Sequence, residues 1–239
     1  MTVDELISIT ETITKLLSVI IWPSLFVYFL IRFGPDLKDF IKGAAEFSFK
    51  GAGFEATVRR KQNEIVASLI AAKTAKQEAS NENRIGGAEI KGIADYISTS
   101  VSTRTLRRTL NAQILWVDDN PENNINERQA LESLGVSITI STSTNDAIEL
   151  LSFNTYDLII SDMGRPPDPQ AGYTLLDKMR AQGNQTPYII YAGSRAPEHR
   201  AESRRRGAIT CTNQPDELFD LVLMTLEMKK GAGTSLNLM

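Results

Sequence analysis

The chain of 239 residues is 42% hydrophobic and 23% charged, a globular composition that excludes a disordered, collagen-like or purely coiled-coil protein. Its net charge of -3 gives no general attraction to nucleic acid, and we expect no nucleic-acid partner. The single cysteine, Cys211, and the single histidine, His199, exclude a disulfide framework, a multi-cysteine zinc site and a clustered histidine metal site.

The first 33 residues have the pattern of a membrane anchor. Residues 16–31, LLSVIIWPSLFVYFLI, are uncharged, and as a helix they would rise about 24 Å, a little short of a hydrocarbon core of about 30 Å. Basic residues are frequent after this run, whereas the residues before it are mainly acidic. We therefore expect residues 1–33 to form a single transmembrane helix, with the C-terminal bulk in the cytoplasm. A buried core helix is an alternative, whereas a signal peptide fits poorly because the leader is acidic.

Residues 34–112 are expected to connect the anchor to the rest of the chain, as a juxtamembrane segment and a helical stalk or linker. Good helix formers predict a helix over residues 55–79. Residues near one face of this helix are Val58, Ile65, Leu69, Ala72 and Ala79. This stripe, which Gln62 and Lys76 interrupt, indicates either weak self-association through a short stalk or a simple amphipathic helix.

From residue 113 onward, strand and helix patterns alternate. Short apolar segments predict strands at 114–117, 136–141, 157–161, 188–192 and 208–212. Helical patterns predict helices at 124–134, 145–153, 171–182, 196–206 and 216–229. Five such units predict a doubly wound α/β domain with a parallel sheet over residues 113–230, followed by a tail of small residues, 231–239.

Acidic residues follow two of the predicted strands. Asp118 and Asp119 come directly after the first strand, and Asp162 follows the third. Ligands of such sheets bind at the carboxyl ends of the strands, and carboxylates that converge there suit Mg²⁺. An aspartate beside this ion is a candidate acceptor for a phosphoryl group. Alternatively, Asp119 and Asn120 only cap the helix that follows.

The segments ILWVDDN, YDLIISDMGRP and TPYIIYAG, with a Gly-Ala pair and Pro215 further on, resemble the receiver domain of bacterial response regulators over residues 113–229. The acid pair and the spacing of Asp162 and Pro166 contribute most to this resemblance. It implies a flavodoxin-like sheet of five parallel strands and phosphorylation of Asp162. It also implies a Mg²⁺ site formed by the side chains of Asp118, Asp119 and Asp162 and the carbonyl of Gly164.

Two positions depart from the pattern of receiver domains. Ala192 stands where they usually have Ser or Thr at the end of the fourth strand, and Gln214 stands where they have Lys before a proline. A glutamine carries no charge, so a charge-assisted contact to the phosphoryl group is lost. Ser194 or Arg165 could substitute for it.

A basic cluster lies around the fourth predicted helix of the domain. It consists of Arg195, Arg200, Arg204, Arg205 and Arg206. These residues are candidates for a surface that binds an acidic partner or a nucleotide phosphate. The alternative is a solvated basic helix face.

The sequence contains no Ser-His-Asp set, P-loop or G-x-G-x-x-G motif, and we expect no enzymatic activity. The resemblance implies an atypical phosphoprotein of two-component phosphorelay signalling, and the N-terminal pattern predicts that it is anchored in the bacterial inner membrane. Its expected partners are a histidine kinase or another signalling protein, the membrane, and a second copy of the chain. The alternative function is a pseudo-receiver that senses a partner and acts through a membrane-perturbing N-terminal segment, as in a defence system.

Overall fold

The computed structural model describes residues 54–80, 85–194 and 196–235, and the side chains up to residue 229. The chain divides after Phe54 into two units, and the second, from Glu55 onward, holds the sheet and the helices around it. The expected membrane anchor, residues 1–33, lies outside the described residues. Among the described residues, no helix has the length and apolar character needed to cross a membrane.

Five parallel strands form the sheet at the centre of this unit. They are β1 (Gln113–Val117), β2 (Ser137–Ser141), β3 (Leu158–Ser161), β4 (Tyr188–Tyr191) and β5 (Thr210–Thr212). Their order in the sheet is β2-β1-β3-β4-β5, which is the flavodoxin-like order. The predicted α/β fold with five parallel strands is therefore confirmed. The strand order reverses between β1 and β3, so a ligand site is expected at their carboxyl ends.

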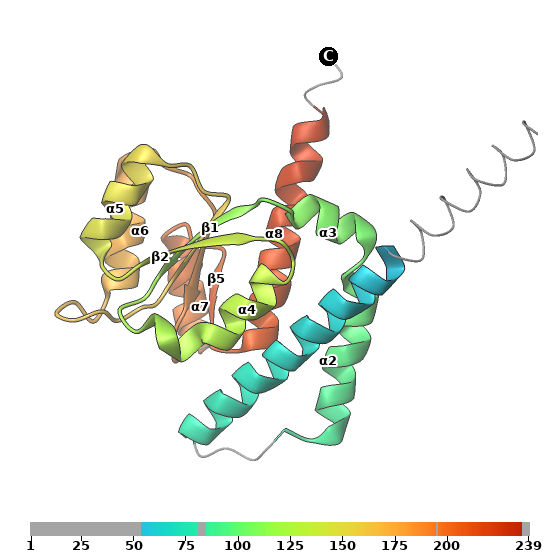
Figure 1. Cartoon of the computed structure of the whole chain (residues 1–239). Coiled ribbons are helices and arrows are strands. Elements are labelled where there is room, and N and C mark those ends of the chain that lie inside the picture. The colour runs from blue at the N-terminus through green and yellow to red at the C-terminus, as the bar shows by residue number, and fades with distance from the viewer. Residues whose placement is uncertain (1–53, 81–84, 195, 236–239) are drawn as a thin grey trace, which may run out of the picture. The chain divides into compact units, whose positions relative to one another are not determined.

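Helices cover both faces of the sheet (Figure 1). Those of the predicted domain are α4 (Ile125–Glu132), α5 (Thr144–Phe153), α6 (Ala171–Ala181), α7 (Pro197–Arg205) and α8 (Pro215–Ser235), with a short 3-10 turn, η1 (Pro121–Asn124), before α4. Alternate residues of the strands point to opposite faces. Trp116 therefore packs in a core cluster with Leu131 of α4 and Phe219 of α8, whereas Leu115 packs with Leu176 of α6.

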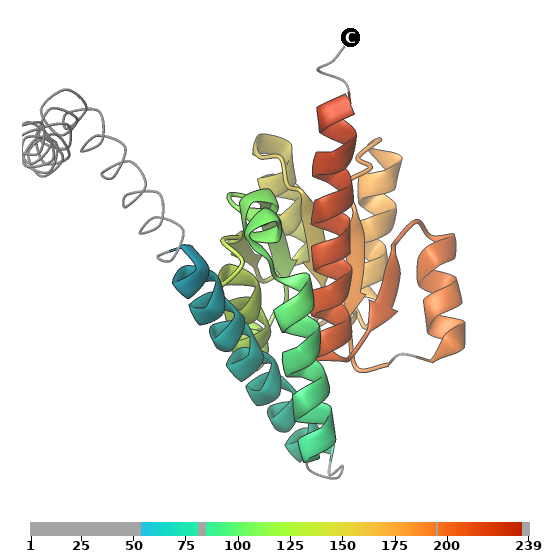
Figure 2. The same cartoon turned by 90° about the vertical axis from the view of Figure 1, so that its right-hand side faces the viewer.

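A pair of N-terminal helices packs on the side of the sheet that α4 and α8 cover (Figures 1 and 2). The chain is helical over residues 54–80, and α2 (Gly87–Ser100) and α3 (Thr103–Thr109) follow. We call residues 54–80 and 85–100 the hairpin. Its residues Leu69 and Ile97 are buried in the same core cluster as Phe219.

This packing decides between the two interpretations of the apolar stripe on the first helix. Ile65, Leu69 and Ala72 are each at most 1% exposed, so the helix is amphipathic and packs on its own chain. The hairpin is not an extended stalk, because hydrophobic burial is satisfied within the unit. Gln62, which interrupts the stripe, donates from Nε2 to the carbonyls of Ser98 (3.2 Å) and Val101 (2.7 Å) at the end of α2.

The last helix is longer than the sequence pattern predicts. We expect a helix over 216–229 and a tail from 231, whereas α8 extends to Ser235. Adding a residue to an established helix requires no new nucleus, so small residues with modest propensity can extend it.

Candidate functional site

Three aspartates lie at the carboxyl edge of the sheet, where the strand order reverses. Val117 of β1 pairs with Ser161 of β3, so Asp118 and Asp162 leave their strands at the same level. The amide of Asp162 donates to the carbonyl of Val117 over 2.9 Å. Asp118 is 6% exposed, and Asp119 and Asp162 are half-buried. We call Asp118, Asp119 and Asp162 the acidic pocket.

Repulsion among the carboxylates of the acidic pocket affects the pKa of Asp162. Burial raises the pKa of its carboxyl group, and the charges of Asp118 and Asp119 raise it further. The backbone amide of Met163 and the charge of Arg165 lower the pKa, but they do not reverse the shift. A bound cation would relieve this repulsion.

The carboxylate of Asp118 is held in place by two hydrogen bonds. Its Oδ1 accepts from the amide of Asn120 (2.8 Å), and its Oδ2 accepts from Nδ2 of Asn124 (2.6 Å). Asn124 is itself 7% exposed. The sequence does not predict this role of Asn124, because the role depends on how η1 folds back toward β1.

The alternative that the residues after β1 only cap a helix finds little support. Asn120 is the N-cap residue of η1, but its side chain makes no capping hydrogen bond. Its Nδ2 instead donates to Oδ2 of Asp119 over 2.9 Å. The polar side chains after β1 therefore interact mainly with one another.

The donor set of the acidic pocket suits Mg²⁺. In the described part of the chain, no three His, Cys, Asp or Glu side chains are grouped so as to hold a metal ion by themselves. Mg²⁺ does not require such a cage, because it usually binds one or two carboxylates and keeps several waters. Asp118, Asp119 and Asp162, with the main-chain carbonyl of Gly164, are the residues that could hold it.

The loop after β3 is pressed against the start of α6. The amide of Gly172 donates to the carbonyl of Met163 over 2.8 Å. A Cβ atom on Gly172 would lie only 2.8 Å from the carbonyl oxygen of Asp162. This glycine therefore permits the close approach that positions the backbone of the acidic pocket.

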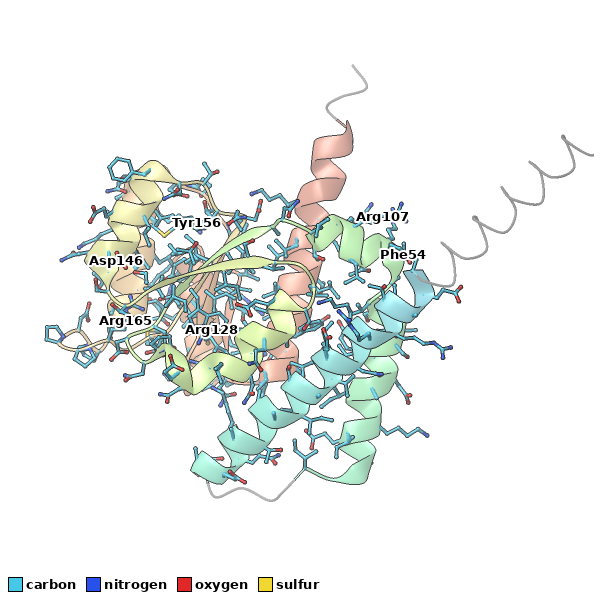
Figure 3. The ribbon with its side chains drawn as sticks, viewed as in Figure 1. Phe54, Arg107, Arg128, Asp146, Tyr156 and Arg165 are labelled. Atoms are coloured by element: carbon cyan, nitrogen blue, oxygen red, sulfur yellow. The ribbon has the colours of Figure 1, made fainter. Side chains whose placement is uncertain are left out.

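Arg165, labelled in Figure 3, stabilises the same loop from within and does not replace the missing lysine. It is 3% exposed, and its Nη1 donates to Oγ of Ser161 (2.7 Å) and to the main-chain oxygen of Asp162 (2.6 Å). Its Nη2 donates to Oγ1 of Thr144 (3.1 Å) and the carbonyl of Ala171 (2.9 Å). Both terminal nitrogens are thus used by structural contacts.

The loops after β4 and β5 are joined by uncharged groups. Nδ2 of Asn213 donates to the carbonyl of Gly193 over 3.3 Å, and Nε2 of Gln214 donates to Oδ1 of Asn213 over 3.2 Å. Ala192, which follows β4, offers no hydroxyl. Oγ of Ser194 lies 2.7 Å from Nδ1 of His199, so it already has a partner outside the acidic pocket.

The arginines around α7 are partly used within the chain. The expected surface comprised Arg195, Arg200, Arg204, Arg205 and Arg206. Arg195 lies outside the described residues. Arg200 pairs with Glu217 at 2.7 Å, and Arg206 pairs with Asp177 at 2.6 Å. Arg204 and Arg205 are exposed, and Arg205 also pairs with Glu202. The surface available to a partner is therefore smaller than the sequence suggests.

Comparison with known proteins identifies the part of the chain that contains the acidic pocket. Residues 114–215 match the family model described as the response regulator receiver domain. Sensor histidine kinase RcsC of Salmonella typhimurium is 27% identical over 143 residues, which are 60% of this chain and 15% of that protein. RcsC of Escherichia coli K12 is 30% identical over 115 residues, 48% of this chain and 12% of that protein. The similarity thus covers a small part of these relatives.

Among solved structures, the Francisella response regulator 1452 receiver domain is 26% identical, with a TM-score of 0.46, and the match covers 50% of this chain and 99% of that one. The signal receiver domain of a putative Luxo repressor protein from Vibrio parahaemolyticus is 22% identical, with a TM-score of 0.47. This match covers 53% of this chain and 98% of that one. The match to the family model identifies residues 114–215 as a response regulator receiver domain, the module of two-component signalling.

Proposed function

We propose that the receiver domain accepts a phosphoryl group on Asp162 and thereby changes its binding to a partner or to a second copy of the chain. The observation that supports this most strongly is the position of Asp162 at the carboxyl edge of the sheet, beside Asp118 and Asp119. A change of affinity requires that the phosphorylated and unphosphorylated states differ in their contacts with the partner.

The proposed chemistry is a transfer between a donor and the carboxylate of Asp162. A carboxylate oxygen forms a bond to phosphorus while the bond from phosphorus to the donor atom breaks, and the leaving group keeps that electron pair. Asn124 and the amide of Asn120 hold Asp118 for metal binding. When bound, Mg²⁺ would neutralise charge on the phosphoryl oxygens.

A histidine kinase is the proposed phosphoryl donor. The relatives reported above are sensor histidine kinases, and residues 114–215 of this chain match the receiver domain model. The similarity covers 15% and 12% of those proteins, so the proposal names a class of donor and no individual kinase.

We also propose that residues 1–33 anchor the chain in the bacterial inner membrane, with the receiver domain on the cytoplasmic side. The uncharged run at 16–31 and the basic residues after it support this orientation. The full chain should then sediment with the membrane fraction and stay there after washes with high salt and with carbonate. Release of the chain by either wash would contradict an integral anchor.

The departures at Ala192 and Gln214 favour a second candidate, a pseudo-receiver that binds a partner without being phosphorylated. In that case the N-terminal segment would be the effector and would perturb the bilayer. Expression of the full chain would then impair membrane integrity when the partner is present.

One experiment separates the two candidates. The full chain is incubated with Mg²⁺ and acetyl phosphate, and its intact mass is recorded beside that of Asp162→Asn. The proposed function predicts the added mass of one phosphoryl group in the wild-type chain only. An unmodified wild-type chain, or equal modification of the variant, would favour the pseudo-receiver.

A further inference from the structure

The first helix of the hairpin reaches the carboxyl edge of the sheet. Apolar residues such as Leu69 hold the middle of this helix in the core beside Phe219. Its last turns lie near α4, as Figures 1 and 2 show. Together with η1 and the loops after β4 and β5, these turns line a cavity of about 650 Å³. Its lining includes Lys76, Asn123, Gly193 and Gln214.

Lys76 is fixed at this edge by two contacts. Its Nζ lies 3.8 Å from Oε1 of Glu127 in α4 and 4.2 Å from the ring centroid of Tyr191 in β4. Glu127 is 3% exposed and accepts a hydrogen bond of 2.7 Å from the hydroxyl of Tyr191. The side chain of Lys76 is 37% exposed, so its charge is positioned by the fold but can still reach solvent.

The same contacts place Lys76 next to the acidic pocket. Ser161 pairs with Ile190 across β3 and β4, so Asp162 follows its strand at the level of Tyr191. Glu127 lies one helical turn after Asn124, which holds Asp118. The ammonium group of Lys76 therefore faces the carboxyl edge of the sheet, where the three aspartates of the acidic pocket lie.

The electrostatics agree with this position. Burial lowers the pKa of Lys76, and the carboxylates of Glu127, Asp118 and Asp162 oppose that shift. The acidic pocket thus acts on the charge of Lys76, although this residue lies about forty positions earlier in the chain than Asp118.

We infer that Lys76 supplies, from the hairpin, the positive charge beside the phosphoryl site that Gln214 does not supply from the loop after β5. This inference rests on the proposed phosphorylation of Asp162. It makes the hairpin part of the site, because the ammonium group reaches the edge of the sheet only when the first helix is docked. Phosphorylation should in turn strengthen that docking, since both effects arise from one interaction.

The described cations nearest to Lys76 are engaged elsewhere. Lys73, one turn earlier, is 7% exposed and pairs with Glu89 (2.6 Å) and Asp216 (3.0 Å). Arg128 of α4, labelled in Figure 3, donates from Nη2 to the carbonyl of Pro121 over 3.0 Å. Arg165 is occupied by the loop after β3. Among the cations that the structure describes, Lys76 is thus the one best placed to respond to a phosphoryl group.

The test compares four full-length chains: wild type, Lys76→Met, Lys76→Arg and the control Lys61→Met, which removes a cation from the same helix. Each is phosphorylated with acetyl phosphate and Mg²⁺, the donor is removed, and loss of the phosphoryl group is followed by intact mass. We expect Lys76→Met to lose the group about tenfold faster, the effect of one charge-assisted hydrogen bond. Lys76→Arg should retain it nearly as long as the wild type, and Lys61→Met should match the wild type.

Affinity for Mg²⁺ separates an electrostatic role from a structural one. Removing a cation near Asp118 and Asp162 should leave Mg²⁺ binding as tight as in the wild type or tighter, whereas a distorted pocket would bind it more weakly. Faster loss of the phosphoryl group together with weaker Mg²⁺ binding would therefore overturn the inference. So would equal rates in Lys76→Met and the wild type. If the wild-type chain takes no phosphoryl group at all, the proposed function itself fails, and the inference fails with it.

Amide hydrogen exchange tests the predicted coupling to the hairpin. In the wild-type chain, phosphorylation should slow exchange in residues 54–80, and in Lys76→Met it should not. Exchange that is unchanged by phosphorylation in the wild type would show that the hairpin does not respond to the site.

Discussion

Asn124 and Asp118 form a buried hydrogen bond of 2.6 Å between the end of η1 and the end of β1. The amide group of Asn124 donates to Oδ2 of Asp118 and fixes the orientation of the carboxylate. It also joins the start of α4 to the acidic pocket. The same helix carries Glu127, one turn further on, which contacts Lys76.

Replacement of Asn124 by alanine should weaken Mg²⁺ binding by about 10- to 100-fold, the usual effect of removing a group that orients a metal ligand. Isothermal titration calorimetry on the full chain measures this directly. Asn123→Ala is the matched control, because Asn123 is exposed and the bond to Asp118 is made by its neighbour. Equal affinities of the two variants would contradict the orienting role of Asn124.

Gly172→Ala should destabilise the chain, although the same change usually stabilises a helix by about 1 kcal/mol. The new Cβ would meet the carbonyl oxygen of Asp162 at 2.8 Å, so the backbone of the pocket must shift. Gly92→Ala in α2 is the control, because nothing lies within 4 Å of its Cβ position. Chemical denaturation should therefore give opposite signs for the two changes in the free energy of unfolding. Stabilisation of both variants would show that the loop after β3 adapts freely.

Leu69→Ala should lower the free energy of unfolding by about 2–5 kcal/mol, the range for a large apolar side chain removed from a core. Leu69 is 1% exposed, whereas Ile90 on α2 is 37% exposed and serves as the control. Circular dichroism and tryptophan fluorescence should report one common transition for wild-type chain, because the hairpin and the sheet share a core cluster. A small effect of Leu69→Ala, or an early separate transition of the helices, would mean that the hairpin is only loosely attached.

Asp162→Asn should raise the melting temperature in the absence of Mg²⁺ at neutral pH. Burial and the nearby aspartates raise the pKa of Asp162 above its ordinary value of 3.8, so folding disfavours its ionised form. The advantage of the variant should vanish below pH 3.8, where the carboxyl group is protonated in both the folded and the unfolded chain. The difference in melting temperature between the variant and the wild type should reach its full size once the pH exceeds the raised pKa of Asp162.

The expected rise is a few degrees, since about 1 kcal/mol shifts the melting temperature by about 2–4 °C in a protein of this size. Asp95→Asn, an exposed position on α2, should have no such effect. Saturating Mg²⁺ should remove or reverse the difference, because only the wild type keeps the full set of carboxylates. A lower melting temperature for Asp162→Asn without metal would contradict the repulsion described above.

The sheet could be predicted from the sequence because its signals are local. The two strands that lead to the acidic pocket are mainly apolar and are followed by acids: ILWV comes before Asp118, and LIIS comes before Asp162. Parallel strands bring their carboxyl ends to one edge, so the grouping of Asp118, Asp119 and Asp162 follows from the strand pattern alone.

The contribution of the hairpin could not be predicted, because it depends on contacts between residues distant in sequence. The apolar stripe of the first helix indicates that one face is buried but does not say against what. Its two interruptions were the available signal: Gln62 satisfies carbonyls at the end of α2, and Lys76 reaches Glu127. Polar residues that break an apolar stripe can thus mark the points where a helix meets other polar groups.

The suggestion that Arg165 replaces the missing lysine illustrates the same limit. In sequence it stands three residues after Asp162, close enough to reach the carboxylate. In the structure its side chain turns into the interior and donates to Ser161 and Ala171. Side-chain direction in a loop is set by such local acceptors, which sequence spacing does not reveal.

The most direct test of the central claim is to locate the phosphoryl group in the full chain. After treatment with acetyl phosphate and Mg²⁺, reduction with borohydride converts a phosphorylated aspartate to homoserine, and peptide mass spectrometry identifies the converted position. We predict conversion at Asp162 that requires Mg²⁺ and is absent at Asp118 and Asp119. Conversion at either of those two residues, or none at Asp162, would contradict the account.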